Sequence, residues 1–297
     1  MDIPYEIYNW AISYLNNQKH FTKFNNDVND VACINAGVIQ GSSLGPILFS
    51  IVMSSLKTLY RENSLFKYAD DCFLVIPEAN IQQLPDKMNH IVSWGKSNNL
   101  VVNHRKCKLM GVYSRNKRKI PDLNFNHIHD ISIMNELNIL GVTVQTNFSL
   151  AKHVSTIVNK CNKLFYLLRI LKGSNLDVIS RRDFFMATIY AHITFAANAW
   201  YWFCHEEERS RLCKIMKHGV KLNILDAKDA DLDKSLEARA RKLFLKIVTD
   251  ELHVLHHLLL PKKRVNYSLC EKTHGLCLPP IVTPHDTNNF IIHMMYL

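Results

Sequence analysis

The chain has 297 residues, of which 47% are hydrophobic, so it can bury one large core or two smaller ones and is not an intrinsically disordered chain. Its formal net charge of +10 fits either a polyanionic partner or a solvated basic surface, and charge alone favours neither. Residues 146–297 hold 22 Lys and Arg against 14 Asp and Glu. We therefore expect any attraction for nucleic acid to come mainly from that half.

The cysteines indicate the compartment. All eight are scattered without a CxxC pair, and the N-terminus reads as an amphipathic helix rather than a signal peptide, so we expect reduced thiols in an intracellular protein of the nucleus or cytoplasm, not a secreted one. Cys270, His274 and Cys277 form a cluster whose spacing fits no zinc pattern. Residues 187–204 carry no Asp, Glu, Lys or Arg, and their length and polar residues predict a buried helix rather than a membrane span.

The beginning of the sequence predicts alternating helices and strands. A helix over residues 4–17 follows from apolar side chains repeating on one helical face, and a polar turn separates two strands, 20–24 and 31–35. The loop 37–41 begins and ends with glycine and leads into an apolar helix over about 43–60. Because that helix is apolar on most sides, we expect it to be buried.

Short apolar runs on both sides of Asp70 and Asp71 predict a β-hairpin whose turn is acidic. A helix over about 81–99 follows, because apolar residues repeat at helical spacing. Three further strands are expected before residue 145, at 100–102, 109–113 and 137–144. Residues 115–119 are expected to form a basic loop between strands.

From residue 150 onward the apolar spacing predicts helices alone. They are expected at 152–172, 177–204, 206–225 and 236–259. Strands stop and basic charge rises near residue 145, so two domains are predicted, 1–145 and 146–297. The predicted fold class is α+β, an antiparallel sheet with packed helices followed by an all-α domain.

Asp70 and Asp71 are candidate metal ligands. Adjacent aspartates between apolar strands are costly unless a cation neutralises them. Mg²⁺ prefers carboxylate oxygens and substrate phosphates, and two such ions about 4 Å apart can hold the attacking and leaving oxygens of a phosphoryl transfer. Asp-Asp turns are also common in solvated hairpins, and the pair taken alone favours that interpretation.

A segment upstream of the two aspartates favours the metal-binding interpretation over the solvated turn. Residues 37–49 read Gly-Val-Ile-Gln-Gly-Ser-Ser-Leu-Gly-Pro-Ile-Leu-Phe. This resembles the nucleotide-pocket segment of reverse transcriptases, G-x-P-Q-G-S-x-L-x-P-x-L-F, with Ile39 in place of the proline. Tyr68-Ala69-Asp70-Asp71 then matches the F/Y-A-D-D catalytic hairpin of that family.

Three further segments follow in the order of the family. Trp94 with residues 100–108 resembles its W-x(n)-N-L-x-L-N-x-x-K-x-K segment, and Leu140-Gly141-Val142 resembles its primer-grip turn. Residues 150–171 resemble the thumb helix of retrotransposon enzymes. The chain is thus similar to the palm and thumb of a reverse transcriptase, an RNA-directed DNA polymerase, of a non-LTR (LINE-type) retrotransposon. Domain 1–145 would be a partial palm and 146–297 a helical thumb with a C-terminal extension.

The resemblance implies RNA template, DNA primer and deoxynucleoside triphosphates as partners, no membrane, and Mg²⁺ or Mn²⁺ as cofactor. It assigns the metal to Asp70 and Asp71, proton donation to Lys106, nucleotide or template contacts to Gln40, Gly41 and Tyr68, and the primer grip to Leu140 and Gly141. The predicted nucleic-acid backbone contacts share one predicted helix and are Lys160, Lys163, Arg169 and Lys172. Structural alternatives remain open: Gln40 as a loop cap, and the lysines as solvated charges. Trp200 and Trp202 are expected in the core rather than as base-stacking platforms.

The resemblance also implies another essential aspartate, on a strand F-x-D-x-x-x-A-F-D that would precede the helix predicted at 4–17. Asp2 is not expected to replace it. We therefore expect an incomplete metal site and an apolar sheet face exposed to solvent. Three interpretations stay open: a polymerase whose missing N-terminal portion belongs to the same polyprotein, a non-catalytic nucleic-acid-binding fragment, and a nonfunctional remnant.

Overall fold

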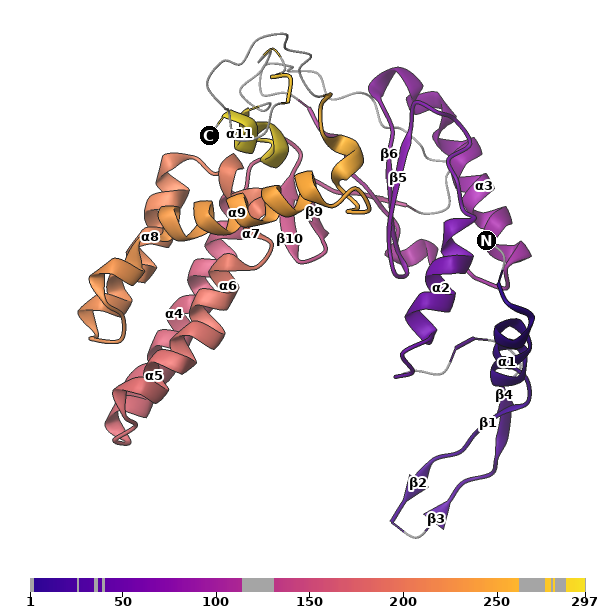
Figure 1. Ribbon diagram of the computed structural model, residues 1–297, viewed down its shortest axis with the longest axis horizontal. Coiled ribbons are helices and arrows are strands. Elements are labelled where there is room, and N and C mark those ends of the chain that lie inside the picture. Colours follow the sequence, from indigo (N-terminus) through magenta and orange to yellow (C-terminus); the bar gives the residue numbers. More distant parts are fainter. Residues whose placement is uncertain are drawn as a thin grey trace. The chain divides into compact units, whose positions relative to one another are not determined.

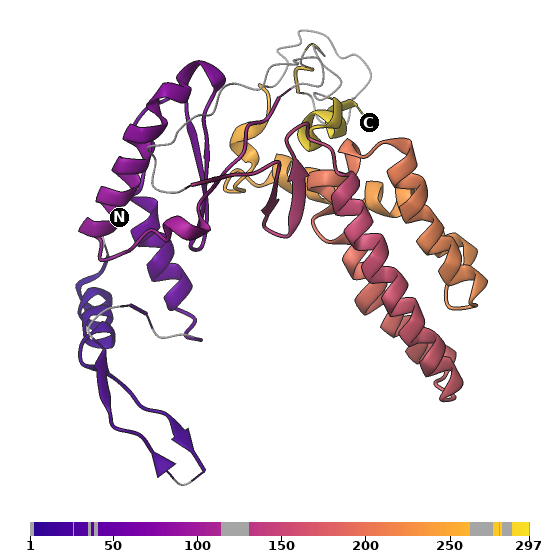
Figure 2. The ribbon, with the colours of Figure 1, turned by 180° about the vertical axis from the view of Figure 1, so that it is seen from behind.

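The computed structural model describes residues 3–25, 27–34, 37–38, 41–113, 131–261, 276–278, 280 and 287–296. The chain divides into two compact units, shown in sequence colours in Figure 1 and from behind in Figure 2. The first comprises Met1–Cys107 and Pro121–Ser132, and the second comprises Lys108–Ile120 and Ile133–Leu297. The fold class is α+β, as predicted, but the strands described form five separate two-stranded pairs rather than one sheet.

The first unit begins with a helix and a long hairpin, the indigo part of Figure 1. Helix α1 (Tyr5–Leu15) lies where the sequence predicted it, and it buries none of its residues. In the hairpin, β1 (Gln18–His20) pairs with β4 (Ala32–Ile34), and β2 (Lys23–Phe24) pairs with β3 (Asp27–Val28). The predicted pair of strands is confirmed, although each is interrupted.

Helix α2 (Gly45–Ser54) is shorter than the predicted helix, and the prediction that it is buried was wrong. Ile47 is 57% exposed and Ile51 is 55% exposed, while Gly45 and Met53 are its buried residues. An apolar helix face needs a partner surface to be buried, and the described residues of the first unit leave the face of Ile47 and Ile51 open.

The rest of the first unit holds the acidic hairpin and a second helix. Strands β5 (Ser64–Tyr68) and β6 (Asp71–Val75) are followed by the 3-10 turn η1 (Glu78–Gln83) and by α3 (Leu84–Ser97). The strand predicted at 100–102 is wrong, since Val101 is 94% exposed and no strand forms there. Instead Leu100 donates its N–H to the Gly95 carbonyl and closes the end of α3, and the turn η2 (His104–Lys106) follows.

Short strands precede the helices of the second unit. They are β7 (Lys108–Leu109), β8 (Ser132–Ile133), β9 (Glu136–Ile139) and β10 (Val142–Gln145). The long run predicted at 137–144 is therefore a hairpin, in which β9 pairs with β10. Helix α4 (Ala151–Gly173) follows and packs against β10, confirming the predicted helix.

One helix was predicted over 177–204, and the structure shows a broken run instead. Its pieces are α5 (Val178–Phe185), a π-helical turn η3 (Met186–Tyr190), α6 (Ala191–Thr194), α7 (Ala197–Trp200) and the turn η4 (Tyr201–Phe203). The break falls at Phe195 and Ala196, where Ala196 has a left-handed φ of +50°. Apolar spacing does not predict this break, because neither residue is a helix breaker.

The last helices enclose the core of the second unit. Helix α8 (Glu206–Lys221) agrees with the prediction, whereas α9 (Leu232–Thr249) begins and ends earlier than predicted. The short turns η5 (Ala227–Ala230) and η6 (His256–Leu258) and the helix α11 (Phe290–Tyr296) complete the described elements.

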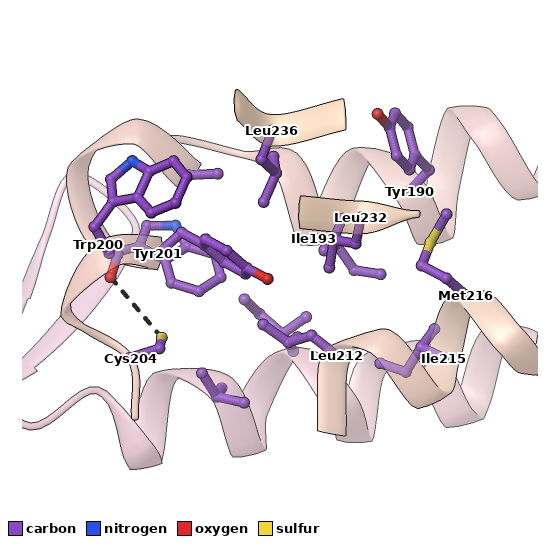
Figure 3. Close-up of a cluster of buried hydrophobic side chains, with 14 of the residues drawn as sticks. Tyr190, Ile193, Trp200, Tyr201, Cys204, Leu212, Ile215, Met216, Leu232 and Leu236 are labelled. Carbon is purple, nitrogen blue, oxygen red and sulfur yellow. Dashed lines mark hydrogen bonds between the residues drawn. The ribbon is translucent and has the colours of Figure 1, made fainter. Parts of the chain in front are cut away.

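Apolar side chains from α6 to α9 meet in one core (Figure 3). Trp200 is 1% exposed and Trp202 is 8% exposed, so the expectation that both are core residues is confirmed. The cysteines described, seven in number, are free thiols. No helix in the described part of the chain is long and apolar enough to cross a membrane.

Candidate active site

Asp70 and Asp71 lie at the tip of the β5–β6 hairpin. Tyr68 pairs directly with Asp71, so Ala69 and Asp70 form a two-residue loop between the strands. Ala69 has φ +50°, a left-handed conformation that is uncommon for a residue with a Cβ. Such conformations concentrate at functional sites, because the surrounding structure must hold them in place.

The two faces of this hairpin differ. Directly paired residues share a face, so Tyr68 and Asp71 lie on the same side as the pair Phe66 and Phe73. On that side Tyr68 is 66% exposed and Phe66 is 60% exposed. The apolar exposure expected from the sequence is therefore present, and Asp71 lies at its edge.

Lys67 lies on the opposite face and anchors the hairpin. Its Nζ donates to the carbonyl oxygens of Met53 at 2.6 Å and Leu56 at 2.9 Å, at the C-terminal end of α2. A cation is favourable there because the carbonyls at the end of a helix lack hydrogen-bond donors and carry partial negative charge. Burial, and then the nearby charge of Lys57, lowers the pKa of the Lys67 ammonium.

Helix α2 thus connects two parts of the candidate site. At its start Gly41 has φ +85°, which favours glycine, and the Ser42 hydroxyl accepts a hydrogen bond from the Gly45 N–H at 2.9 Å. At its end Lys67 holds the hairpin. Sequence reasoning missed Lys67, although a lysine at an inward position of an alternating strand was a signal that could have found it.

The donor atoms at the hairpin fit one divalent ion. Asp70 and Asp71 are both exposed, and their carboxylates are the hard oxygen ligands that Mg²⁺ takes, with water and substrate phosphates filling the other positions. Among the residues that the structure describes, no group of three or more His, Cys, Asp or Glu could hold a metal ion. These two carboxylates therefore do not by themselves make a two-ion site.

The other site residues predicted in this half either have few contacts or lie outside the described residues. Lys106 is exposed on η2, in the same compact unit as Asp70, and its N–H donates to the Asn103 carbonyl. Gln40 and Asp2 lie outside the described residues, so their roles stay predictions. Cys270 and His274 of the cluster considered for zinc also lie outside them.

The candidate primer-grip turn belongs to the second unit. Ile139 pairs with Val142, so Leu140 and Gly141 form a two-residue turn with φ +48° and +90°. Positive φ at both positions matches the right-handed twist of a hairpin. The Asn138 side-chain oxygen accepts a hydrogen bond from the Gly141 N–H at 2.8 Å.

His153 of α4 contacts this hairpin at Thr143, next to the turn. Its Nδ1 accepts a hydrogen bond from the Thr143 N–H at 3.3 Å, and its ring meets Trp200 edge to face, with centroids 4.9 Å apart. Burial, and then the charge of Lys160, lowers the pKa of the His153 imidazole. The β9–β10 hairpin, α4 and α7 are therefore joined through one buried side chain.

Comparison with protein families bears on this arrangement. Residues 2–144 match the family model for reverse transcriptase (RNA-dependent DNA polymerase). The match spans the Gly41 loop, the Asp70 hairpin, Lys106 and the Leu140-Gly141 turn, and it ends before α4. Searches of curated proteins and of solved structures gave no match. The reverse transcriptase resemblance of the first half is confirmed, while the retrotransposon type and the thumb assignment stay predictions.

The basic residues predicted to follow nucleic acid lie beyond the reverse transcriptase match, on α4. Lys160, Lys163, Arg169 and Lys172 are all exposed, and α4 contains no Asp or Glu. They do not form one row: Lys163 and Arg169 are six residues apart, which places them about 120° apart around a helix. Lys163 instead shares its face with Tyr166, which is three residues further along and 63% exposed.

Proposed function

We propose that this chain carries the nucleotidyl-transfer hairpin of a non-LTR-type reverse transcriptase, with residues 1–145 as a partial palm and 146–297 as a helical thumb. In the intact protein the reaction would be RNA-templated extension of a DNA primer by deoxynucleoside triphosphates. The observation that carries the proposal is the two-residue turn that presents Asp70 and Asp71 within the residues matching the reverse transcriptase family.

Asp70 and Asp71 would hold a Mg²⁺ or Mn²⁺ ion together with substrate phosphates, and the ion would neutralise charge on those phosphates. Lys67 fixes the hairpin that carries both carboxylates, through its hydrogen bonds to the end of α2. Lys106, exposed in the same unit, would donate a proton to the pyrophosphate that leaves. Gly41, Gln40 and Tyr68 would contact the incoming nucleotide or the template.

We propose further that the chain by itself binds nucleic acid without extending primers. Phosphoryl transfer depends on positioning and on neutralising charge, and two carboxylates hold fewer ions than the reaction uses. Binding without catalysis is the second candidate function, and it is favoured by the exposed basic residues of α4. In the intact protein, a further segment of the palm would cover the exposed apolar side of the hairpin.

Metal binding tests the central assignment. The signal of free Mn²⁺ in electron paramagnetic resonance measures its binding to the chain in the presence of a primer–template and a deoxynucleoside triphosphate. The wild-type chain should bind Mn²⁺, Asp70→Asn and Asp71→Asn should each weaken binding about tenfold or more, and Asp27→Asn, an exposed aspartate of β3 in the same unit, should leave it unchanged. Equal binding by the wild type and the Asp70→Asn variant would contradict the proposal.

A further inference from the structure

Phe195 places an aromatic ring against the candidate primer-grip turn. It follows α6 and is 56% exposed. A Cβ added at Gly141 would lie 2.9 Å from Cε1 of Phe195, so the ring rests directly on the glycine backbone. Leu140, the other turn residue, is 41% exposed. A partly exposed aromatic ring and a glycine of the candidate primer-grip turn thus lie side by side within the second unit.

The backbone that carries this ring is held from the core. Trp200, 1% exposed, donates its indole N–H to the Phe195 carbonyl at 2.9 Å, and the Phe195 N–H donates to the Ala191 carbonyl. The next residue, Ala196, has φ +50°, a left-handed conformation that costs energy for a residue with a Cβ. Such a conformation persists because the surrounding structure holds it, and it is typical of sites where geometry serves a function. The backbone that carries the exposed ring is therefore held in place.

Trp200, which holds the Phe195 backbone, also contacts the basic helix α4. Trp200 contacts His153 of α4, and His153 accepts the hydrogen bond from Thr143 in β10. Helix α4 carries Lys160, Lys163, Arg169 and Lys172 without any acidic residue, while its Lys152 forms an ion pair with Glu136 of β9. Proteins that bind nucleic-acid strands combine positive charge for the backbone with aromatic rings on which bases stack. A nucleic-acid strand would use both the basic side chains of α4 and the exposed ring of Phe195. An acidic peptide would need the basic side chains but not the aromatic ring.

We infer that Phe195 is a stacking residue, against which a base of the nucleic-acid strand passing the Leu140-Gly141 turn packs. This inference deepens the proposed function and rests on it. Trp200 and Trp202 are buried, as expected from the sequence, whereas Phe195 presents an exposed ring. Gly141 contributes by lacking a Cβ, which leaves room for the ring.

The test compares substitutions in the full chain. Binding of a fluorescein-labelled RNA template annealed to a DNA primer is measured by fluorescence anisotropy, and a 2-aminopurine at the 3′ end of the primer reports stacking. Phe195→Ala should weaken binding about 5- to 100-fold, because stacking of a base on an aromatic ring has that effect when the ring is removed. It should also lose the quenching of 2-aminopurine, and it should leave the salt dependence unchanged because phenylalanine carries no charge. Phe195→Trp should retain both signals.

The matched control is Phe148→Ala. Phe148 is a 46% exposed phenylalanine beyond the other end of the β9–β10 hairpin, so its removal should change neither affinity nor quenching. Thermal unfolding of each variant separates loss of contact from loss of fold. Unchanged affinity and quenching in Phe195→Ala, with a wild-type chain that binds, would overturn the inference alone. A wild-type chain that binds no nucleic acid would overturn the proposed function as well.

Discussion

The ammonium nitrogen of Lys67 lies 2.6 Å from the carbonyl oxygen of Met53, and this contact fixes the acidic hairpin on the helix that follows the Gly41 loop. The Gly41 loop and the acidic hairpin, both parts of the proposed site, are thereby joined through α2 and one side chain. A lysine rather than a hydrophobic residue serves here, because the last carbonyls of α2 need hydrogen-bond donors.

Replacing Lys67 by methionine should loosen the end of α2. Methionine keeps the length of the side chain but leaves the Met53 and Leu56 carbonyls without their donor, at a cost of about 1–2 kcal/mol. Peptide-resolved hydrogen–deuterium exchange should show faster exchange over residues 45–56. Lys57→Met is the control: the charge of Lys57 lowers the pKa of Lys67, so removing it should leave exchange unchanged or slower.

The chain should not extend primers on an RNA template with Mg²⁺ or Mn²⁺. Among the described residues, no group of three or more His, Cys, Asp or Glu could hold a metal ion. A metal site with one carboxylate too few raises the barrier by several kcal/mol, which slows the reaction about a thousandfold or more. A gel-based extension assay should therefore show no product above background for the wild type or for Asp70→Asn. Robust synthesis by the wild type that disappears in Asp70→Asn would show that the metal site is complete.

The contribution of α4 to binding should appear in the salt dependence. The affinity for nucleic acid falls as salt rises, so log K plotted against log salt concentration has a negative slope. Lys163→Gln should make this slope less steep by about 0.7–0.9, the effect of losing one phosphate contact. Lys228→Gln, whose side chain is 80% exposed and lies near Asp226 on η5, should leave the slope unchanged. An unaltered slope for Lys163→Gln would remove this lysine from the nucleic-acid interface.

Gly141 should tolerate no side chain. Gly141→Ala places a Cβ 2.9 Å from the Phe195 ring at a φ of +90°, so we expect the second unit to lose about 1–3 kcal/mol of stability. Gly173→Ala is the matched change, because nothing lies within 4 Å of its added Cβ, and it should be neutral or stabilising by up to about 1 kcal/mol. Urea unfolding of the two variants measures the difference, and equal stabilities would contradict the packing described.

The second unit should lose stability on mild acidification. Burial lowers the pKa of His153 and of His293 below their ordinary value of 6.5, so the unfolded chain binds protons more readily than the folded one. Stability should therefore fall as the pH drops below 6.5 and continue to fall until it passes the folded pKa values. His153→Asn keeps an acceptor for the Thr143 N–H but does not titrate. Unfolding curves measured from about pH 7.5 to about pH 5, a range that brackets the ordinary pKa of histidine, should therefore show a smaller loss of stability for this variant. A loss as large as in the wild type would exclude His153 as its source.

The local elements with strong patterns could be predicted from the sequence. Alternating apolar residues around Asp70 and Asp71 predicted the hairpin, and apolar residues at helical spacing predicted α1, α3, α4 and α8, because these signals depend on near neighbours in the chain. The motifs at residues 37–49 and 68–71 predicted a resemblance to reverse transcriptases, and the family model that matches residues 2–144 confirms this resemblance for that region.

Burial and long-range contacts were decided by tertiary structure alone. The apolar composition of α2 could not show that Ile47 would be exposed, since burial requires a partner surface that composition does not specify. The break at Phe195 and Ala196 depends on the Trp200 indole and on the space above Gly141, and the anchoring role of Lys67 depends on carbonyls eleven and fourteen residues away. Each of these features depends on which side chains and backbone atoms the fold brings into contact. Local patterns point to a candidate such as the inward lysine of β5, but they do not specify its partner.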